Sequence, residues 1–267
     1  MKPLWLIGDD IERSLSPAMQ NAALAEIGED AAYALKQCSA AELHAVLDDA
    51  ERECRGVNVT APHKVEVARR YADVLDDDAR AAGSVNTVIF DGGRAVRALN
   101  TDVPGLLFAW KRSALHIEDR TIAVVGAGGA ARSVIVAAQQ AGARGVVVHA
   151  RRESAAAGLL VLAAELGLDA VTADRPCGAR VAVLASSSLD DPAGTIDKAL
   201  AGPGAVHDLR YGDGARATRN AALKAGHLFV DGTLMLLAQA QVALAAFLGK
   251  AVPEPAATAM RKALTRR

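Results

Sequence analysis

Three clusters of polar residues stand where neither a helix nor a strand requires them. They read Ser14-Leu15-Ser16-Pro17, Asn58-Val59-Thr60-Ala61-Pro62-His63-Lys64 and Asn100-Thr101-Asp102. Lysine and aspartate side chains can carry acid–base chemistry, so Lys64 and Asp102 are candidate functional residues. Hydroxyl groups both donate and accept hydrogen bonds, so Ser14, Ser16 and Thr60 are candidates for contacts with a polar ligand.

A glycine-rich segment indicates a second kind of chemistry. Gly126-Ala127-Gly128-Gly129-Ala130-Ala131-Arg132 follows the apolar run 121–125 and opens a helical pattern. In this context Gly126 permits a tight turn, Gly128 lets the backbone approach a pyrophosphate, and Ala131 stands where a third glycine is usual. The alternative, an ordinary strand-to-helix turn, rarely needs three glycines in four residues. We therefore predict a dinucleotide site formed by Gly126, Ala127, Gly128, Gly129 and Ala130.

The end of the next predicted strand indicates which dinucleotide binds. NAD enzymes place an acidic residue there, about 20 residues after the glycine segment. Here the chain reads Val148-His149-Ala150-Arg151-Arg152, with no acid before the arginines. Guanidinium groups grip phosphate bidentately, so Arg151 and Arg152 favour the 2′-phosphate of NADP. The alternative is a solvated arginine pair, which would oppose the helix dipole, and the nearby Glu153 keeps NAD possible.

Short apolar runs alternate with longer helical patterns, which predicts an α/β fold of parallel sheets covered on both faces. The predicted strands are 4–7, 32–35, 56–59, 86–90, 94–98, 121–125, 146–149, 181–184, 205–209 and 228–230. The predicted helices are 17–27, 40–52, 130–141, 153–166 and 233–248. Ser16 is the predicted N-cap of the first helix, and Ser39 with Glu42 matches a capping box at the second. Asp91-Gly92-Gly93 marks a hairpin.

These elements predict two domains. Residues 1–102 plus 233–267 form an N-terminal α/β substrate-binding and catalytic domain, to which the last long helix returns. Residues 103–232 form a Rossmann-type NADP-binding domain. Ligands of parallel sheets bind beyond the carboxyl ends of the strands, so the first two polar clusters converge on one pocket. Because the join near Thr101 to Gly105 is short, we expect the domains to meet across a cleft.

Composition excludes several classes of protein. Among 267 residues, Lys plus Arg is 30 and Asp plus Glu is 31, a net charge of −1 that argues against binding to nucleic acid or an anionic membrane. Cys38, Cys54 and Cys177 lie far apart, so we expect neither a disulfide framework nor a metal site. No signal-peptide core or membrane span stands out. We expect a cytoplasmic protein, monomeric or homodimeric, that acts on a small molecule.

Seven segments, in order along almost the whole chain, resemble motifs of the shikimate dehydrogenase family. They are Ser14 to Ser16, Asn58 to Lys64, Gly83-Ser84-Val85-Asn86-Thr87, Asn100 to Asp102, the glycine segment, Asp208-Leu209-Arg210-Tyr211, and Gly232 with Met235 and Gln239. Any one segment is weak evidence, whereas seven in the family order are highly specific. The resemblance implies reversible reduction of 3-dehydroshikimate to shikimate by NADPH, a step of the shikimate pathway of aromatic amino acid biosynthesis.

The resemblance also implies a role for each matching residue. Ser14 and Ser16 hold the substrate carboxylate, and Lys64 with Asp102 forms the catalytic pair. Met235 borders the nicotinamide. The resemblance further implies that Asn86, Tyr211 and Gln239 contact the substrate.

Departures from the family motifs gather in the second half of the chain and at the join. Val103 stands where glycine is usual, Ala150 replaces an asparagine, and Arg210 replaces an aliphatic residue. One alternative is therefore a quinate/shikimate dehydrogenase that uses NAD, although Ser16 favours shikimate because quinate-preferring relatives often carry threonine there. A non-catalytic sensor of a shikimate-like metabolite is another alternative, which the retained lysine–aspartate pair argues against.

Each candidate residue also has an ordinary structural interpretation. Ser16 is explained as an N-cap and Lys64 as a solvated lysine on a helix surface. Asp102 is explained as the N-cap of the next helix and Asn86 as a turn residue. Gln239 lies inside an apolar run and is harder to explain in this way, because a buried amide needs partners. The coincidence of all these residues with one family order favours the functional interpretation.

Overall fold

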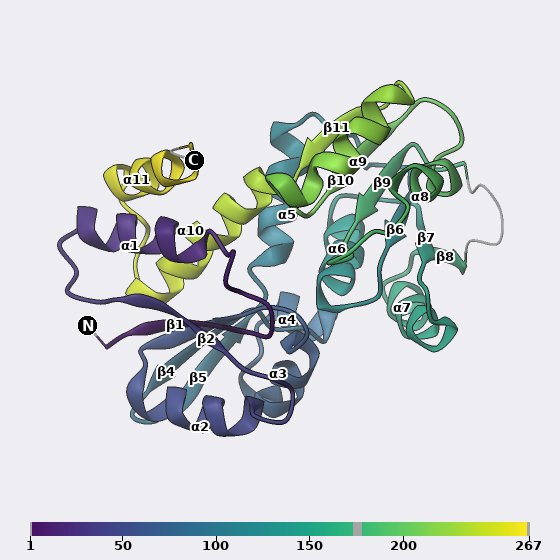
Figure 1. The fold of residues 1–267 in the computed structure, drawn as a ribbon. Helices are drawn as coiled ribbons and strands as arrows, with labels where there is room; N and C mark the ends of the chain where they lie inside the picture. The colour runs from purple at the N-terminus through teal and green to yellow at the C-terminus, as the bar shows by residue number, and fades with distance from the viewer. Residues whose placement is uncertain (1, 173–177, 266–267) are drawn as a thin grey trace. The chain divides into compact units, whose positions relative to one another are not determined.

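The computed structural model describes residues 2–172 and 178–265, and Figure 1 shows its helices and strands. The chain forms two compact units. Unit 1 comprises Met1–Asp102 and Leu236–Arg267, and unit 2 comprises Val103–Met235. Helix α10 (Thr233–Leu248) therefore begins in unit 2 and continues in unit 1. Cys177 lies outside the described residues.

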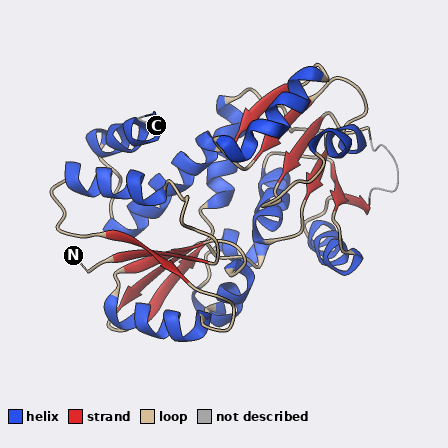
Figure 2. Ribbon diagram, in the orientation of Figure 1, coloured by secondary structure: helices blue, strands red, loops and turns tan. Residues whose placement is uncertain are grey.

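Unit 1 is built on a sheet with the strand order β2-β1-β3-β4-β5, which Figure 2 shows in red. Its strands are β1 (Leu4–Gly8), β2 (Tyr33–Gln37), β3 (Gly56–Val59), β4 (Thr87–Asp91) and β5 (Arg94–Leu99). The strands β2, β1 and β3 are parallel, but β4 runs antiparallel to both β3 and β5, so the expectation of a parallel sheet is wrong here. The predicted hairpin is confirmed, because Gly92 and Gly93 turn β4 into β5 with φ of 58° and 76°.

Helices cover both faces of this sheet. On one face, strand residues such as Ile7 and Val57 pack against α2, α3 and α4. On the other face, strand residues such as Leu6 and Tyr33 pack against α1, α11 and the unit 1 part of α10. Successive residues of a strand point to opposite faces, so Asn58 shares the α1 face. These helices are α1 (Ser16–Glu26), α2 (Leu43–Glu53), α3 (Lys64–Arg70), α4 (Asp77–Ala82) and α11 (Glu254–Thr265).

Unit 2 is built on a parallel sheet with the strand order β11-β10-β9-β6-β7-β8. When the six strands are numbered along the chain from β6, their order is 6-5-4-1-2-3, which is the doubly wound order of dinucleotide-binding folds. In that order the direction of winding reverses between the first and fourth strands, here β6 and β9. Its strands are β6 (Thr121–Val125), β7 (Gly145–His149), β8 (Asp169–Thr172), β9 (Val181–Leu184), β10 (Ala205–Asp208) and β11 (Leu228–Asp231). The α/β fold class with two domains is confirmed.

The helices α6 (Gly129–Gln140), α7 (Glu153–Glu165), α8 (Pro192–Ala199) and α9 (Asp213–Lys224) belong to unit 2. Helix α5 (Asp102–Arg112) begins at the last residue of the first segment of unit 1 and continues in unit 2. The helices α8 and α9 pack through Ile196, Ala199 and Ala222 against strand residues such as Ala182 and Val206. None of the described helices is long and apolar enough to span a membrane.

Two predicted helix starts are wrong. Helix α1 begins at Ser16 itself, so Leu15 is the N-cap residue and provides no side-chain cap. Helix α2 begins at Leu43, beyond the predicted capping box. The Glu42 carboxylate does accept hydrogen bonds from the Ser39 backbone N–H and hydroxyl, at 2.8 and 2.7 Å, but this pair closes the turn that precedes the helix.

A buried histidine lies in the sheet of unit 2. His207, in β10, has no exposed surface, and its Nδ1 accepts a hydrogen bond from the Trp110 indole at 3.1 Å. Burial lowers the pKa of His207 to about 4, against the opposing attraction of Asp208 and Asp231. His207 is therefore neutral in the folded protein at any pH well above that value.

This histidine predicts a loss of stability in mild acid. Between pH 6.5 and 4 the unfolded chain binds a proton at His207 that the folded chain does not. We expect the free energy of unfolding to fall as the pH drops through this range, by about 3 kcal/mol. Urea unfolding at a series of pH values measures the slope. The variant His207→Gln keeps an acceptor for the indole and should flatten the profile; an equally steep profile in that variant would rule His207 out as the cause.

Candidate active site

Lys64 and Asp102 form an ion pair in unit 1, with 2.6 Å between Nζ and Oδ2. Lys64 is the first residue of α3, and Asp102 is the first residue of α5. The lysine side chain is 13% exposed and the aspartate side chain 5%. The interpretation of Lys64 as a solvated surface lysine is therefore wrong. A lysine at a helix N-terminus also opposes the helix dipole, so helix stability does not explain its position.

The loop after β3 holds Lys64 in place. The methyl group of Thr60 lies against Gly8, where an added Cβ would come within 2.5 Å of it, so glycine is required for this approach. The His63 imidazole lies 2.9 Å from the Cys38 carbonyl oxygen through Nε2. A carbonyl only accepts, so Nε2 carries the proton and donates it. These contacts bind the loop to the ends of β1 and β2, directly before Lys64.

Asn86 orients the carboxylate of Asp102. The Asn86 amide Nδ2 donates to Asp102 Oδ1 at 2.8 Å, so the two carboxylate oxygens are shared between Asn86 and Lys64. Asn86 Oδ1 in turn accepts from the backbone N–H of Thr101 at 2.8 Å. The N–H of Asp102 donates to Asn100 Oδ1 at 3.1 Å. The interpretation of Asn86 as a turn residue and that of Asp102 as an N-cap therefore do not account for the hydrogen bond between their side chains or for the ion pair with Lys64.

The two predicted carboxylate-binding serines lie at the start of α1. Ser14 Oγ accepts a hydrogen bond from the N–H of Ser16 at 3.2 Å, and Ser16 is 8% exposed. The N-cap interpretation of Ser16 is wrong, since Ser16 is the first residue of α1 and Leu15 occupies the cap position.

Gln239 lies on the part of α10 that belongs to unit 1. Its Oε1 accepts from the Thr101 hydroxyl at 3.4 Å, and its Nε2 donates to the Leu236 carbonyl at 2.8 Å. The amide therefore has the partners that an amide inside an apolar run requires. A continuous set of hydrogen bonds joins Gln239, Thr101, Asn86, Asp102 and Lys64.

The glycine segment of unit 2 fits a dinucleotide. Gly126 has φ of 117°, and a Cβ there would come within 2.9 Å of the Ala185 backbone, so only glycine fits. A Cβ on Gly128 would meet no atom within 4 Å, which shows open space above this residue. Gly128 is the N-cap residue of α6, which has no side-chain cap and no acidic residue in its first turn. The positive end of this helix faces that space, as an anionic pyrophosphate requires.

Arg151 and Arg152 follow β7 and are both exposed, and Arg152 is the N-cap residue of α7. No ion pair or side-chain hydrogen bond engages either guanidinium within residues 2–172 and 178–265. Their positive charges are therefore available to an anion. Ala150, which stands between them and the strand, offers no polar side chain.

Tyr211 and Met235 also lie in unit 2, and an ion pair fixes the segment that carries Tyr211. Arg210 binds both oxygens of the fully buried Asp208 through Nε at 3.0 Å and Nη2 at 2.7 Å, and Nη2 also donates to the Thr218 hydroxyl at 2.7 Å. The arginine that departs from the family motif thus has a structural partner. Met235 is 7% exposed.

Comparison with known proteins decides the family. A family model described as "Shikimate dehydrogenase substrate binding domain" matches residues 6–88. A shikimate dehydrogenase (NADP(+)) of Rubrobacter xylanophilus is 34% identical to this chain, covering 97% of it and 94% of the relative. This chain belongs to the shikimate dehydrogenase family. The shikimate 5-dehydrogenase of Thermus thermophilus, solved in complex with NADP(H) and shikimate, has a TM-score of 0.81 at 32% identity, over 98% of this chain and 100% of that one.

A second solved member of the shikimate dehydrogenase family has a similar fold. The enzyme of Mycobacterium tuberculosis has a TM-score of 0.80 at 30% identity, over 99% of this chain and 100% of that one. Residues 6–88 include five predicted site residues of unit 1. They are Ser14, Ser16, Thr60, Lys64 and Asn86.

Sequence reasoning missed several residues that organise this site. Tyr33, Thr87 and Thr101 carry the hydrogen bonds behind Asn86, yet Tyr33 belongs to no motif of the sequence, and Thr87 and Thr101 stood in motifs without a role of their own. Asn58 was noted only as part of a motif. Its position in a strand whose four residues are all buried was a usable signal, because a buried amide needs partners.

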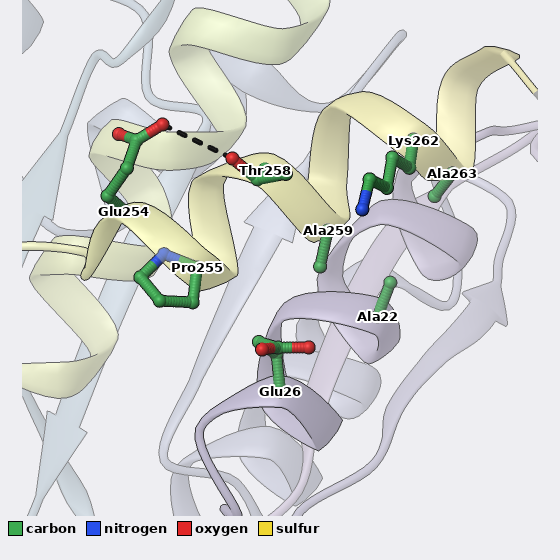
Figure 3. Close-up of a pocket in the computed structure, with 8 residues that line it drawn as sticks. All are labelled: Ala22, Glu26, Glu254, Pro255, Thr258, Ala259, Lys262 and Ala263. Atoms are coloured by element: carbon green, nitrogen blue, oxygen red, sulfur yellow. Dashed lines mark hydrogen bonds between the residues drawn. The ribbon is translucent and has the colours of Figure 1, made fainter.

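One further groove lies apart from these residues. Figure 3 shows it between α1 and α11, with Glu26 and Lys262 among its lining residues and a hydrogen bond from Thr258 to Glu254. None of the predicted site residues lines it. Within the described part of the chain, no group of three or more His, Cys, Asp or Glu side chains is placed to hold a metal ion.

Proposed function

We propose that this protein is an NADP-dependent shikimate dehydrogenase that reduces 3-dehydroshikimate reversibly to shikimate. The observation that carries the proposal is the buried Lys64–Asp102 pair, 2.6 Å between Nζ and Oδ2, in a chain related to NADP(+) shikimate dehydrogenases over nearly its whole length. Unit 1 supplies the substrate and proton-transfer residues. Unit 2 supplies the cofactor residues.

Proton transfer is the task of Lys64. Bound NADPH supplies the hydride that adds to the ketone carbon. The carbonyl oxygen then gains negative charge, and the Lys64 ammonium donates a proton to it, while in the reverse direction the amine takes the proton from the hydroxyl group. Asp102 holds the ammonium in place through Oδ2, and Asn86 keeps Asp102 turned toward it.

Substrate binding is the task of the residues around this pair. The hydroxyls of Ser14, Ser16 and Thr60 donate to the carboxylate without adding a second buried charge. The amides of Asn86 and Gln239 bind hydroxyl groups of the ring. Tyr211 lies in unit 2, and its contact with the carboxylate stays a prediction.

Cofactor binding is the task of the segment after β6 and the arginines after β7. The backbone of Gly126, Gly128 and the start of α6 holds the pyrophosphate. Arg151 and Arg152 hold the 2′-phosphate, because guanidinium groups bind phosphate oxygens bidentately. Met235 borders the nicotinamide. Ala127, Gly129 and Ala130 complete the segment that binds the dinucleotide.

A direct rate measurement tests this function. The absorbance of reduced nicotinamide is followed with purified protein, shikimate and NADP, beside parallel reactions with NAD and with quinate. The proposal expects the largest kcat/KM with shikimate and NADP. A larger kcat/KM with quinate would show that quinate is the preferred substrate. If the protein bound shikimate but gave no rate with any combination of substrate and cofactor, it would be a sensor and not an enzyme.

The arginine pair predicts a loss of cofactor preference. We expect Arg151→Ala to raise KM for NADP about tenfold or more, since a charged hydrogen bond contributes about 1.5–3 kcal/mol, and to leave KM for NAD unchanged. Arg152→Ala should act in the same direction. The matched control is Arg144→Ala, an exposed arginine before the other end of β7. Equal KM for NADP in Arg151→Ala and wild type would refute the phosphate contact.

A further inference from the structure

A chain of buried hydrogen bonds runs from the serine end of unit 1 to its ion pair. The Tyr33 hydroxyl donates to Asn58 Oδ1 at 2.8 Å, and Asn58 Nδ2 donates to the Thr87 hydroxyl at 2.9 Å. Thr87 donates to Asn86 Oδ1 at 3.1 Å, and Asn86 Nδ2 donates to Asp102 Oδ1 at 2.8 Å. The first four residues of this chain are 0–7% exposed, so water does not substitute for any of these bonds.

The direction of every bond follows from its last member. A carboxylate only accepts, so Asn86 must turn its NH2 group toward Asp102 and its oxygen toward Thr87. Thr87 then donates, and its oxygen accepts from the NH2 group of Asn58. The oxygen of Asn58 is left facing Tyr33. The phenol must therefore donate, and no other arrangement satisfies all of these groups at once.

Tyr33 is suited to remain the donor. Burial raises the pKa of the Tyr33 phenol well above its usual value, against the opposing effect of a hydrogen bond from Ser16, so the phenol keeps its proton. That proton is committed to Asn58. The Tyr33 hydroxyl is therefore the first donor of the chain that ends at Asp102.

We propose that Tyr33 is a positioning residue: its hydroxyl supplies the donor that completes the Asn58–Thr87–Asn86 chain and so helps to hold Asp102 in the orientation that pairs with Lys64. The proposal rests on the proposed function for its kinetic consequences, but its structural content does not depend on the identity of the substrate. In this role Tyr33 acts through Asn58, Thr87 and Asn86.

The test is Tyr33→Phe, which removes one oxygen atom and leaves the ring. Without the donor, the Asn58 oxygen is buried and unpaired, while its NH2 group keeps the Thr87 hydroxyl and the Asn86 carbonyl oxygen as acceptors, at 2.9 and 3.2 Å. We expect kcat to fall about tenfold, which is the effect of one unsatisfied buried group, with KM for NADP unchanged. The matched control is Tyr71→Phe. Tyr71 is also a buried tyrosine of unit 1 and donates to Glu51 at 2.8 Å, outside this chain, so its kcat should equal that of wild type.

A double-mutant cycle separates positioning from a general loss of stability. Thr87→Val breaks the same chain one bond further on. If the effect of Tyr33 passes through Thr87, then Tyr33→Phe has little further effect on kcat in the Thr87→Val background, whereas independent effects add. Additive losses in kcat, or equal kcat in Tyr33→Phe and Tyr71→Phe, would overturn the proposal.

A second measurement keeps this proposal distinct from the proposed function. The side-chain NH2 resonances of Asn58 and Asn86 report their hydrogen bonds without any substrate. We expect both to shift in Tyr33→Phe and neither to shift in Tyr71→Phe. Unchanged Asn86 resonances in Tyr33→Phe would overturn the positioning role even in an active enzyme. An inactive wild-type protein would overturn the proposed function, and the resonances would still decide the role of Tyr33.

Discussion

Lys64→Ala is expected to lower kcat for shikimate oxidation about a thousandfold, within the range usual for loss of a general acid–base group. The substitution removes the group that takes the proton from the substrate hydroxyl. It also leaves the carboxylate of Asp102, 5% exposed, without its counter-charge. Because the residues proposed for NADP lie in unit 2, we expect cofactor binding to persist. Steady-state kinetics and titration with NADP measure the two effects separately.

The control for this prediction lies on the same helix. Arg69 is in α3 with a side chain 74% exposed, and its partner Glu66 lies one turn away on the surface. Arg69→Ala should leave kcat within twofold of wild type, since exposed ion pairs contribute about 0–1 kcal/mol. A Lys64→Ala variant that retained a tenth of the wild-type kcat would exclude Lys64 as the proton donor.

Arg210→Met is expected to lower the free energy of unfolding of unit 2 by about 3–5 kcal/mol, because it breaks a buried ion pair and leaves one charge unpaired. Asp208 has no exposed surface, and both of its oxygens accept from Arg210. Methionine fills a similar volume but supplies no donor, so the cost comes from the carboxylate. The Thr218 hydroxyl, also fully buried, loses a partner as well.

A nearby arginine provides the matched control. Arg216, on α9, pairs with Asp213 at 3.2 Å, with the two side chains 72% and 89% exposed. Arg216→Met should change the free energy of unfolding by no more than about 0.5 kcal/mol. Urea unfolding followed through Trp110, which lies in unit 2, measures both variants. Equal unfolding midpoints for Arg210→Met and Arg216→Met would show that the buried pair contributes nothing to stability.

Local physics explains what the sequence alone predicted about the fold. The apolar runs that became β1, β3, β6, β7, β9 and β10 are hydrophobic because they are buried on both faces, and this pattern is visible without any tertiary contact. The Asp91-Gly92-Gly93 hairpin depends on two residues that adopt positive φ, which is a property of glycine itself. Helix α10 was predicted with its observed bounds because its apolar run is long and uninterrupted by glycine or proline.

Elements held by distant contacts were not predicted. Helices α3 and α4 have only seven and six residues, which is too short for a periodic pattern to emerge. Strand β8 has the mostly exposed pattern of an edge strand, so it lacks an apolar run. The start of α1 was placed one residue late because Ser16 matches a capping residue by type, while in the folded chain it is the first residue of the helix.

The sequence by itself determined the family and predicted which residues would carry the two kinds of chemistry, because motifs such as Asn58 to Lys64 and Gly126 to Arg132 are contiguous and read directly. Only the tertiary structure decided that Lys64 and Asp102 meet. They lie 38 residues apart, and the antiparallel pairing of β4 with both β3 and β5 brings the ends of β3 and β5 to one edge of the sheet, where the two side chains lie 2.6 Å apart. It alone also decided that Tyr33 stands behind Asn86, since the pleat of β2 and β3 turns Tyr33 and Asn58 to one face, and no local pattern encodes which strands are neighbours.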